Sequence, residues 1–256
     1  MTTIILIALL GWLMGVVVNY LADVLPYKRR ISHPFCQKCN TDQPIWQYLI
    51  WPRKCVSCGF RRNIRTWIVE ILSIIITVWL WYFPPEPLGF WIGLLLLGYF
   101  AVVVIIDLEY RLIMHPVSIF GALIGLLIGI WLNGFQLTLL GGAAGFGVMF
   151  FFYLGGILFA KVMARLKGQD IDEEALGFGD VNLSGVLGLL LGWPVIFAGL
   201  FLAILSGAIV SLLYMAGMVI FRRYRTFVAI PYGPFLIAGA VFLLYFRDFI
   251  LIHFGQ

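Results

Sequence analysis

The four cysteines of this 256-residue chain form two C-x2-C pairs, an arrangement typical of a metal site. Fifteen residues, 40–54, separate the pairs. Each pair can chelate an ion from one tight turn, and the intervening loop is long enough to bring both pairs to the same ion. Two disulfides or four free thiols are the alternatives, and the cellular compartment decides among them. The spacing predicts a tetrahedral, structural zinc site with the ligands Cys36, Cys39, Cys55 and Cys58.

The rest of the chain has the composition of a membrane protein. Hydrophobic residues make up 62% of it, charged residues only 11%, and the mean hydropathy is +1.03, whereas soluble domains are about half apolar and a quarter charged. Eight runs are long enough to cross the roughly 30 Å hydrocarbon core. We therefore predict an all-α polytopic protein with transmembrane segments at 3–25, 66–83, 88–106, 117–133, 137–160, 181–196, 197–220 and 229–246.

Three of these segments carry further local signals. Only Gly192-Trp193-Pro194 separates the sixth segment from the seventh, so one kinked helix is the alternative there. The fifth segment contains a glycine-rich stretch, 141–147, that favours close packing between helices.

The basic residues predict the orientation of the chain in the membrane. Sixteen of the seventeen Lys and Arg residues fall in loops on one side, and the exception is Arg247. By the positive-inside rule that side is the cytoplasm, so the cysteine loop is cytoplasmic and both chain ends lie outside. A reducing cytosol favours zinc over disulfides. This topology explains the net charge of +5 without a nucleic-acid partner, and attraction to anionic membrane lipids is a residual effect of the same charges.

Two aspartates lie at the predicted cytoplasmic ends of membrane segments. Asp107 follows the apolar run 88–106, and Asp180 ends a Gly-Phe-Gly-Asp sequence just before another apolar run. Ionisable groups at membrane depth are costly and usually functional. Two carboxylates that share one water divide the work: the charged one removes a proton from the attacking water, and the protonated one stabilises the oxyanion and then protonates the leaving amine. This chemistry would hydrolyse a peptide bond.

Other interpretations of these residues remain open. Asp107 is also consistent with an interfacial charge cluster that includes Glu109 and Arg111, and Asp180 with an N-cap of the next helix. A transporter or an ion- or proton-relay protein with a zinc-stabilised cytoplasmic loop would also carry intramembrane acids, although the hydropathy has no inverted repeat. A presenilin-like protease would leave the cysteine loop unexplained, and the cytosolic side disfavours a thiol oxidoreductase.

Several short motifs follow one another in a specific order. They are Leu25-Pro26, the paired cysteines, Val-Glu-Ile-Leu at 69–72, Ile-Asp-Leu-Glu at 106–109, Gly-Phe-Gly-Asp-Val at 177–181 and Ile-Pro-Tyr-Gly-Pro at 230–234. In this order and membrane context the chain resembles the bacterial prepilin peptidases, or type IV leader peptidases. These are membrane aspartic proteases of the G-x-G-D type with an attached N-methyltransferase activity. The resemblance runs almost from end to end.

The resemblance implies a specific activity. Such enzymes cut the leader from type IV prepilins and pseudopilins at the cytoplasmic face of the bacterial inner membrane, and then methylate the new N-terminus with S-adenosylmethionine. Asp107 and Asp180 match the catalytic pair. For the methyl donor we nominate Glu70. An alternative is that Glu70 is a structural acid near a helix N-terminus, beside the basic residues at 61–65.

The implied organisation has three parts: a first transmembrane helix (1–26), a cytoplasmic zinc-binding and methyltransferase region (27–65) and a transmembrane bundle with the protease site (66–256). The chain departs from the family pattern at three places. Asn182 stands where Lys is common, Met114-His115 where Pro is followed by Asp or Asn, and Val24 where Arg is usual. Neither aspartate is affected.

Overall fold

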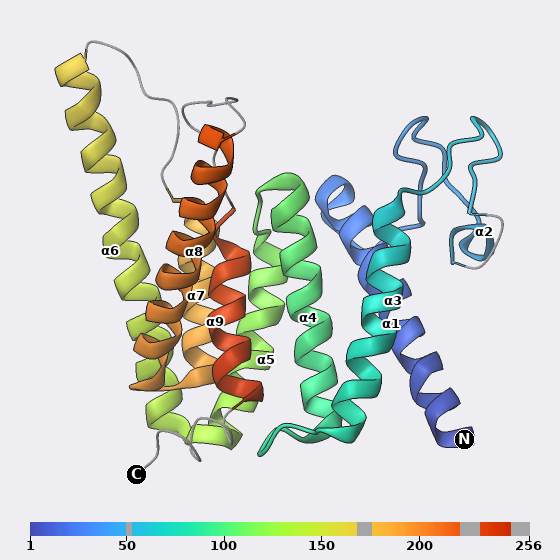
Figure 1. The fold of residues 1–256 in the computed structure, drawn as a ribbon, viewed down its shortest axis with the longest axis horizontal. Helices are drawn as coiled ribbons and strands as arrows, with labels where there is room; N and C mark the ends of the chain where they lie inside the picture. The colour runs from blue at the N-terminus through green and yellow to red at the C-terminus, as the bar shows by residue number, and fades with distance from the viewer. Residues whose placement is uncertain (50–52, 168–175, 221–230, 247–256) are drawn as a thin grey trace. The chain divides into compact units, whose positions relative to one another are not determined.

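The computed structural model describes residues 1–49, 53–167, 176–220 and 231–246, and these stretches form helices and loops without a β-strand (Figure 1). The predicted all-α architecture is therefore confirmed. Nine helices occur in the described stretches: α1 (Thr2–Lys28), α2 (Ile45–Leu49), α3 (Ile64–Tyr82), α4 (Gly89–Tyr110), α5 (His115–Asn133), α6 (Phe135–Lys167), α7 (Phe178–Leu191), α8 (Val195–Ile220) and α9 (Gly233–Tyr245).

Eight of these helices are apolar and correspond in order to the eight predicted segments. Six, namely α1, α3, α4, α5, α6 and α8, are long and apolar enough to cross a membrane, while α7 and α9 are apolar but shorter, with 14 and 13 residues. The sixth and seventh segments are separate helices because the chain turns at Gly192, which has a φ of 72°. The predicted bounds 181–196 are wrong: α7 starts at Phe178 and ends at Leu191.

The chain divides into two compact units, Met1–Ile106 and Asp107–Gln256. In the first unit, α1 and α3 run antiparallel in close contact, because Gly11 and Gly15 of α1 have no side chain between the helices. A Cβ atom at either glycine would lie 2.8 Å from a Cα atom of α3. The side chain of Asn19 adds a hydrogen bond across this contact, from its Nδ2 to the Thr66 carbonyl oxygen at 3.1 Å.

In the second unit, α7 is the central helix and packs against α5, α6, α8 and α9. Ten of its 14 residues are buried. Gly141 and Gly145 of α6 bring the two backbones so close that a Cβ atom on either would overlap a carbonyl oxygen of α7. The hydroxyl of Ser184 also donates to the Gly145 carbonyl oxygen at 2.9 Å. The glycine-rich stretch thus serves close helix packing, as the sequence predicts.

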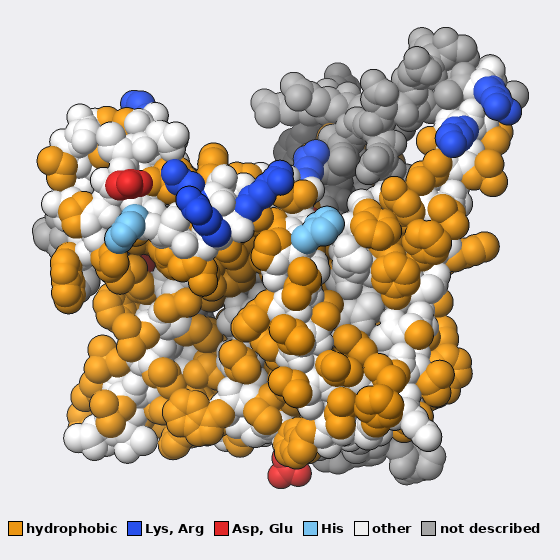
Figure 2. Space-filling model, turned by 180° about the vertical axis from the view of Figure 1, so that it is seen from behind, with side chains coloured by type: hydrophobic (Ala, Val, Ile, Leu, Met, Phe, Trp, Pro, Cys, Tyr) orange, Lys and Arg blue, Asp and Glu red, His pale blue; other side chains and the backbone are white. Residues whose placement is uncertain are grey.

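Hydrophobic side chains cover most of the face drawn in Figure 2. Outward-facing residues such as Leu127 and Phe151 are more than two-thirds exposed, which suits contact with lipid chains rather than water. Arg247, the exception in the charge count, lies outside the described residues. The functional division into 1–26, 27–65 and 66–256 stays a prediction, because the two units reflect packing alone.

Two glycines of α6, Gly145 and Gly147, allow a test of this packing. The change Gly145→Ala would press a methyl group against the Ser184 carbonyl oxygen, whereas a Cβ at Gly147 meets nothing within 4 Å. We expect Gly145→Ala to destabilise the protein by about 1–3 kcal/mol and Gly147→Ala to be neutral or slightly stabilising. Thermal unfolding in detergent measures both. Equal stability of the two variants would contradict the close packing.

Candidate active site and metal centre

Asp107 lies in the last turn of α4 with its carboxylate buried, at 5% exposure. The helix ends there because Arg111 adopts a left-handed conformation, with a φ of 52°, and its N–H donates to the Asp107 carbonyl oxygen at 2.8 Å. Asp107 Oδ2 accepts a hydrogen bond from the backbone N–H of Gly233 at 3.1 Å. Gly233 is the first residue of α9, so the carboxylate lies at a helix N-terminus, where negative charge is stabilised.

Asp180 also lies at a helix N-terminus, that of α7. The sequence-based alternative made it the N-cap, but Gly177 holds that position and Asp180 follows three residues later, inside the first turn. Its Oδ2 accepts from the Gly177 N–H at 3.3 Å. Its Oδ1 is buried and has no hydrogen-bond partner among the described residues. One carboxylate oxygen of Asp180 is therefore held and the other is available.

Ile113 and two glycines bring the two carboxylates together. A Cβ atom at Gly179 would lie 2.8 Å from Ile113 Cβ, and one at Gly233 would lie 3.5 Å from Ile113 Cδ1 and 2.6 Å from Asp107 Oδ2. Bare backbone at the N-termini of α7 and α9 thus packs on the connection between α4 and α5. As a result, the Asp107 and Asp180 carboxylates lie within electrostatic range of each other.

Asp107 does not belong to an interfacial charge cluster. Glu109 and Arg111 are exposed, while Asp107 is buried and makes no ion pair with any described residue. The alternative interpretation of Asp107 is therefore not supported by the structure.

Two of the positions that depart from the family pattern, His115 and Asn182, line one cavity of about 390 Å³ between α5, α6 and α7. Ser118, Phe146 and Leu189 are among its other lining residues. Asn182 follows Asp180 by two residues and so points about 200° away from it around the helix. Asn182 therefore lies on a different face of α7 from the Asp180 carboxylate.

The two cysteine pairs have matching local structures. In the first, the Asn40 N–H donates to the Cys36 carbonyl oxygen at 2.8 Å, and in the second the Gly59 N–H donates to the Cys55 carbonyl oxygen at 2.9 Å. Asn40 and Gly59 have φ angles of 60° and 68°, a conformation that these two residue types adopt most readily. Each pair is thus a tight turn that directs two sulfurs to the same side.

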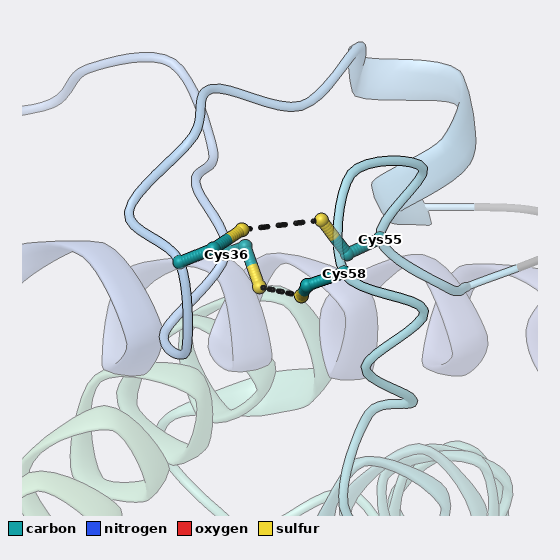
Figure 3. Close-up of side chains that lie close together, drawn as sticks. Cys36, Cys55 and Cys58 are labelled. Carbon is teal, nitrogen blue, oxygen red and sulfur yellow. Dashed lines mark hydrogen bonds between the residues drawn. The ribbon is translucent and has the colours of Figure 1, made fainter.

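The four sulfurs form one cluster that fits zinc. The Sγ atoms of Cys36 and Cys58 are 3.6 Å apart, those of Cys39 and Cys55 are 3.5 Å apart, and all four lie within 4.8 Å of one another (Figure 3). Tetrahedral zinc with Zn–S bonds of about 2.3 Å needs sulfurs about 3.8 Å apart. All four cysteines are free thiols, so the disulfide alternative is not supported. The Cys58 backbone N–H lowers the pKa of the Cys55 thiol, which favours the thiolate that binds metal, whereas burial and the neighbouring cysteine thiols raise the pKa of Cys58.

Asp23 anchors the cysteine loop to α1. Its Oδ2 accepts from the Tyr48 hydroxyl at 2.5 Å and from Arg62 Nη2 at 2.7 Å, and its Oδ1 accepts from Gln37 Nε2 at 3.1 Å and from Arg65 Nη2. Arg62 also stacks on the Tyr48 ring, with its guanidinium carbon 3.8 Å from the ring centroid. Burial, together with the Asp23 charge, raises the pKa of Tyr48 well above its usual range. One buried carboxylate thus fastens the first cysteine turn, α2 and the segment that follows the second cysteine turn.

Glu70 forms a separate buried polar group in the first unit. Its Oε2 accepts from Arg53 Nη2 at 3.0 Å and from Trp12 Nε1 at 3.1 Å, and Glu70 is only 3% exposed. It is the seventh residue of α3, beyond the first turn, so stabilisation by the helix N-terminus does not explain it. Its cationic partner is Arg53 rather than the basic residues at 61–65.

Sequence reasoning missed two residues of these sites. It assigned no role to Gly233, although a Gly-Pro pair opening an apolar helix is a signal for a free N–H at a helix N-terminus. Arg53 counted only toward the topology, because nothing in its local sequence distinguishes it from its basic neighbours.

The fold and the sites define a class: a multi-pass, all-α membrane protein with a pair of buried carboxylates and a four-cysteine loop. Comparison with known proteins makes this specific. Residues 94–212 match the type IV leader peptidase family, and this match includes both Asp107 and Asp180. The chain therefore contains a type IV leader peptidase domain.

Relatives cover more of the chain than this domain. The chain is 28% identical to the prepilin leader peptidase/N-methyltransferase of Bacillus subtilis, over 87% of this chain and 84% of that protein. The enzymes of the same name from Aeromonas hydrophila and Pectobacterium carotovorum are 27% and 26% identical, over 87% and 85% of this chain and 75% of each relative. No solved structure gives a significant match.

The cysteine cluster yields a prediction about metal content. We expect the purified protein to contain one zinc ion per chain and Cys55→Ser to lose it, because three thiolates and a hydroxyl do not complete a tetrahedral sulfur site. Val56→Ser, a change at an exposed position between the cysteines of the same pair, is the control and should keep zinc. Elemental analysis by mass spectrometry measures the ratio. Zinc retained at full stoichiometry in Cys55→Ser would contradict the assignment.

Proposed function

We propose that this protein removes the leader peptide from type IV prepilins and pseudopilins at the cytoplasmic face of the bacterial inner membrane, with Asp107 and Asp180 as the catalytic residues. One observation carries the proposal. Within the type IV leader peptidase domain, two buried carboxylates lie in electrostatic range, each accepts one backbone N–H, and neither has a cationic partner among the described residues.

The proposed reaction uses the two carboxylates differently. One is charged and the other protonated, because two negative charges in a poorly solvated site repel each other. The charged carboxylate removes a proton from a water molecule as it attacks the scissile carbonyl. The protonated one hydrogen-bonds to the oxyanion and then gives its proton to the leaving amine. Asp180 Oδ1, buried and without a partner in the described part of the chain, supports a water-binding role for this residue.

We further propose that the mature N-terminus is methylated in the first unit. The relatives are named as N-methyltransferases. S-adenosylmethionine would supply an electrophilic methyl group, and Glu70 is the residue that we assign to binding it. Glu70 Oε1 is buried and unpartnered among the described residues, which supports a ligand there.

The organisation proposed for the chain follows from these roles. Residues 1–26 form the first transmembrane helix, 27–65 the zinc-binding and methyltransferase region, and 66–256 the bundle with the protease site. The cysteine loop faces the cytoplasm, and both chain ends lie outside. The zinc site is structural, since four cysteines leave no open coordination position for catalysis. The partners are prepilins and membrane lipids. A transporter role has no support from the relatives described above.

Replacing either aspartate tests the catalytic pair. We expect Asp107→Asn and Asp180→Asn each to reduce leader removal from a co-expressed prepilin by at least about 10³-fold, since an amide cannot transfer the proton. Glu109→Gln, which removes an exposed acid from the same end of α4, is the matched control and should cleave normally. The gel shift of the pilin measures cleavage at equal membrane abundance. Persistent cleavage in either aspartate variant would refute the dyad.

The close approach of Gly233 to Asp107 gives a second test. In Gly233→Ala the new Cβ would lie 2.6 Å from Asp107 Oδ2, so the carboxylate must move and we expect cleavage to fall about 10- to 100-fold. Gly217→Ala in α8 is the control, since a Cβ there meets nothing within 4 Å. Initial rates with a purified prepilin in detergent measure the effect. A Gly233→Ala enzyme as fast as Gly217→Ala would contradict the role of this contact.

A further inference from the structure

The group around Glu70 contains buried polar atoms that no described residue satisfies. Arg53 uses Nη2 for both of its hydrogen bonds, to Glu70 Oε2 and to the Leu49 carbonyl oxygen, each at 3.0 Å. Its Nε and Nη1 have no partner, and the same holds for Glu70 Oε1 and Asn19 Oδ1. Arg53 is 8% exposed, Glu70 3% and Asn19 0%. Buried polar groups are nearly always hydrogen-bonded, so this set calls for a ligand.

These atoms belong to one small region of the first unit. Arg53 and Glu70 are in direct contact. Asn19 donates to the carbonyl oxygen of Thr66, which precedes Glu70 by one helical turn and so shares its face of α3. Trp12 and Trp67, both partly exposed, contact the Glu70 carboxylate and the Arg53 guanidinium, so the group lies close to the surface of the unit.

The unsatisfied atoms are of two complementary kinds. Arg53 Nε and Nη1 are donors of a planar cation, and each can donate to an oxygen of an anionic group such as a carboxylate. Glu70 Oε1 and Asn19 Oδ1 are acceptors, and one of them is anionic, so together they match an ammonium group. A ligand that carries a carboxylate and an ammonium group side by side, as an α-amino acid does, would satisfy both kinds. A phosphate group would satisfy only the donors.

We propose that Arg53 binds the α-carboxylate of S-adenosylmethionine, and that Glu70 and Asn19 bind its α-ammonium group. The inference rests on the methyltransferase part of the proposed function. It adds which residues bind which groups of the methyl donor. It also explains why a guanidinium is buried beside Glu70 while two of its nitrogens have no partner among the described residues. The amino-acid end of the methyl donor is thereby held at the contact between α1, α3 and the cysteine loop.

Binding measurements with two ligands test the inference. S-adenosylmethionine and its decarboxylated analogue, which lacks only the carboxylate, are compared by equilibrium dialysis against the zinc-loaded, full-length protein in nanodiscs. We expect the wild type to prefer S-adenosylmethionine about 10- to 100-fold, the range for charge-assisted hydrogen bonds. We expect Arg53→Gln to bind both ligands equally, at the affinity of the analogue. Arg53→Lys keeps the charge without the guanidinium donors and should retain only part of the preference.

Controls separate recognition from folding. Arg61→Gln removes an exposed arginine of the same loop and should keep the full preference. Because Arg53→Gln leaves Glu70 without its cation, the double variant Arg53→Gln with Glu70→Gln provides a neutral pair, and it too should lose the preference. Zinc content and leader cleavage equal to those of the wild type verify that each variant is folded.

The outcomes distinguish this inference from the function on which it rests. If the wild type binds neither ligand, the methyltransferase proposal itself fails. If the wild type binds both equally, or if Arg53→Gln or the neutral pair keeps the preference, methyl-donor binding stands but the role of Arg53 is refuted. In that case ordered water satisfies the buried atoms.

Discussion

The structure depends above all on how it compensates buried acids. In the described part of the chain four acidic side chains are buried: Asp23, Glu70, Asp107 and Asp180. Taking a carboxylate out of water costs several kcal/mol unless charge or hydrogen bonds offset it. In the first unit arginines provide the offset, two for Asp23 and one for Glu70. In the second unit single backbone N–H groups at helix N-termini provide it.

This difference suits the acids of the two units to different roles, a structural one for Asp23 and the proposed catalytic one for Asp107 and Asp180. A carboxylate that accepts hydrogen bonds from two guanidinium groups has its oxygens occupied, which suits the role of Asp23 as an anchor. Asp107 and Asp180 have one N–H each, so their remaining oxygens can exchange protons with a water or a substrate. That arrangement needs bare backbone beside the carboxylates. Glycines satisfy this need, because the Gly233 Cα lies where any side chain would strike Asp107.

Local sequence patterns predicted much of this arrangement. Long apolar runs predicted the eight apolar helices, and the C-x2-C spacing predicted a compact sulfur cluster. The start of α7 was misjudged because glycines are poor helix formers, so the Gly-Phe-Gly-Asp run reads as a lead-in to the helix. In the structure Gly177 caps α7 and the following residues are already helical, which turns the Asp180 carboxylate back toward the Gly177 N–H.

Long-range pairing could not be predicted in the same way. The cysteine loop contains several arginines with similar neighbours, and which of them joins Asp23 and which joins Glu70 depends on the path of the loop. The short helix α2 is a product of that path, since its Tyr48 is held by Asp23 and Arg62. Only three-dimensional contacts distinguish Arg53 from its exposed neighbour Lys54.

The unsatisfied atoms at Asp180 and around Arg53 differ in kind, and this difference argues for different occupants of the two sites. At Asp180 a single acceptor, Oδ1, has no partner among the described residues. One water molecule would satisfy it, and the proposed hydrolysis uses a water molecule. Around Arg53, donors and acceptors are unpartnered together. Water can satisfy both donors and acceptors, but it does so at any polar surface. A zwitterion fits only where opposite charges lie side by side. The buried Arg53–Glu70 pair provides that arrangement, because Arg53 keeps two donor nitrogens and Glu70 one carboxylate oxygen without a partner among the described residues.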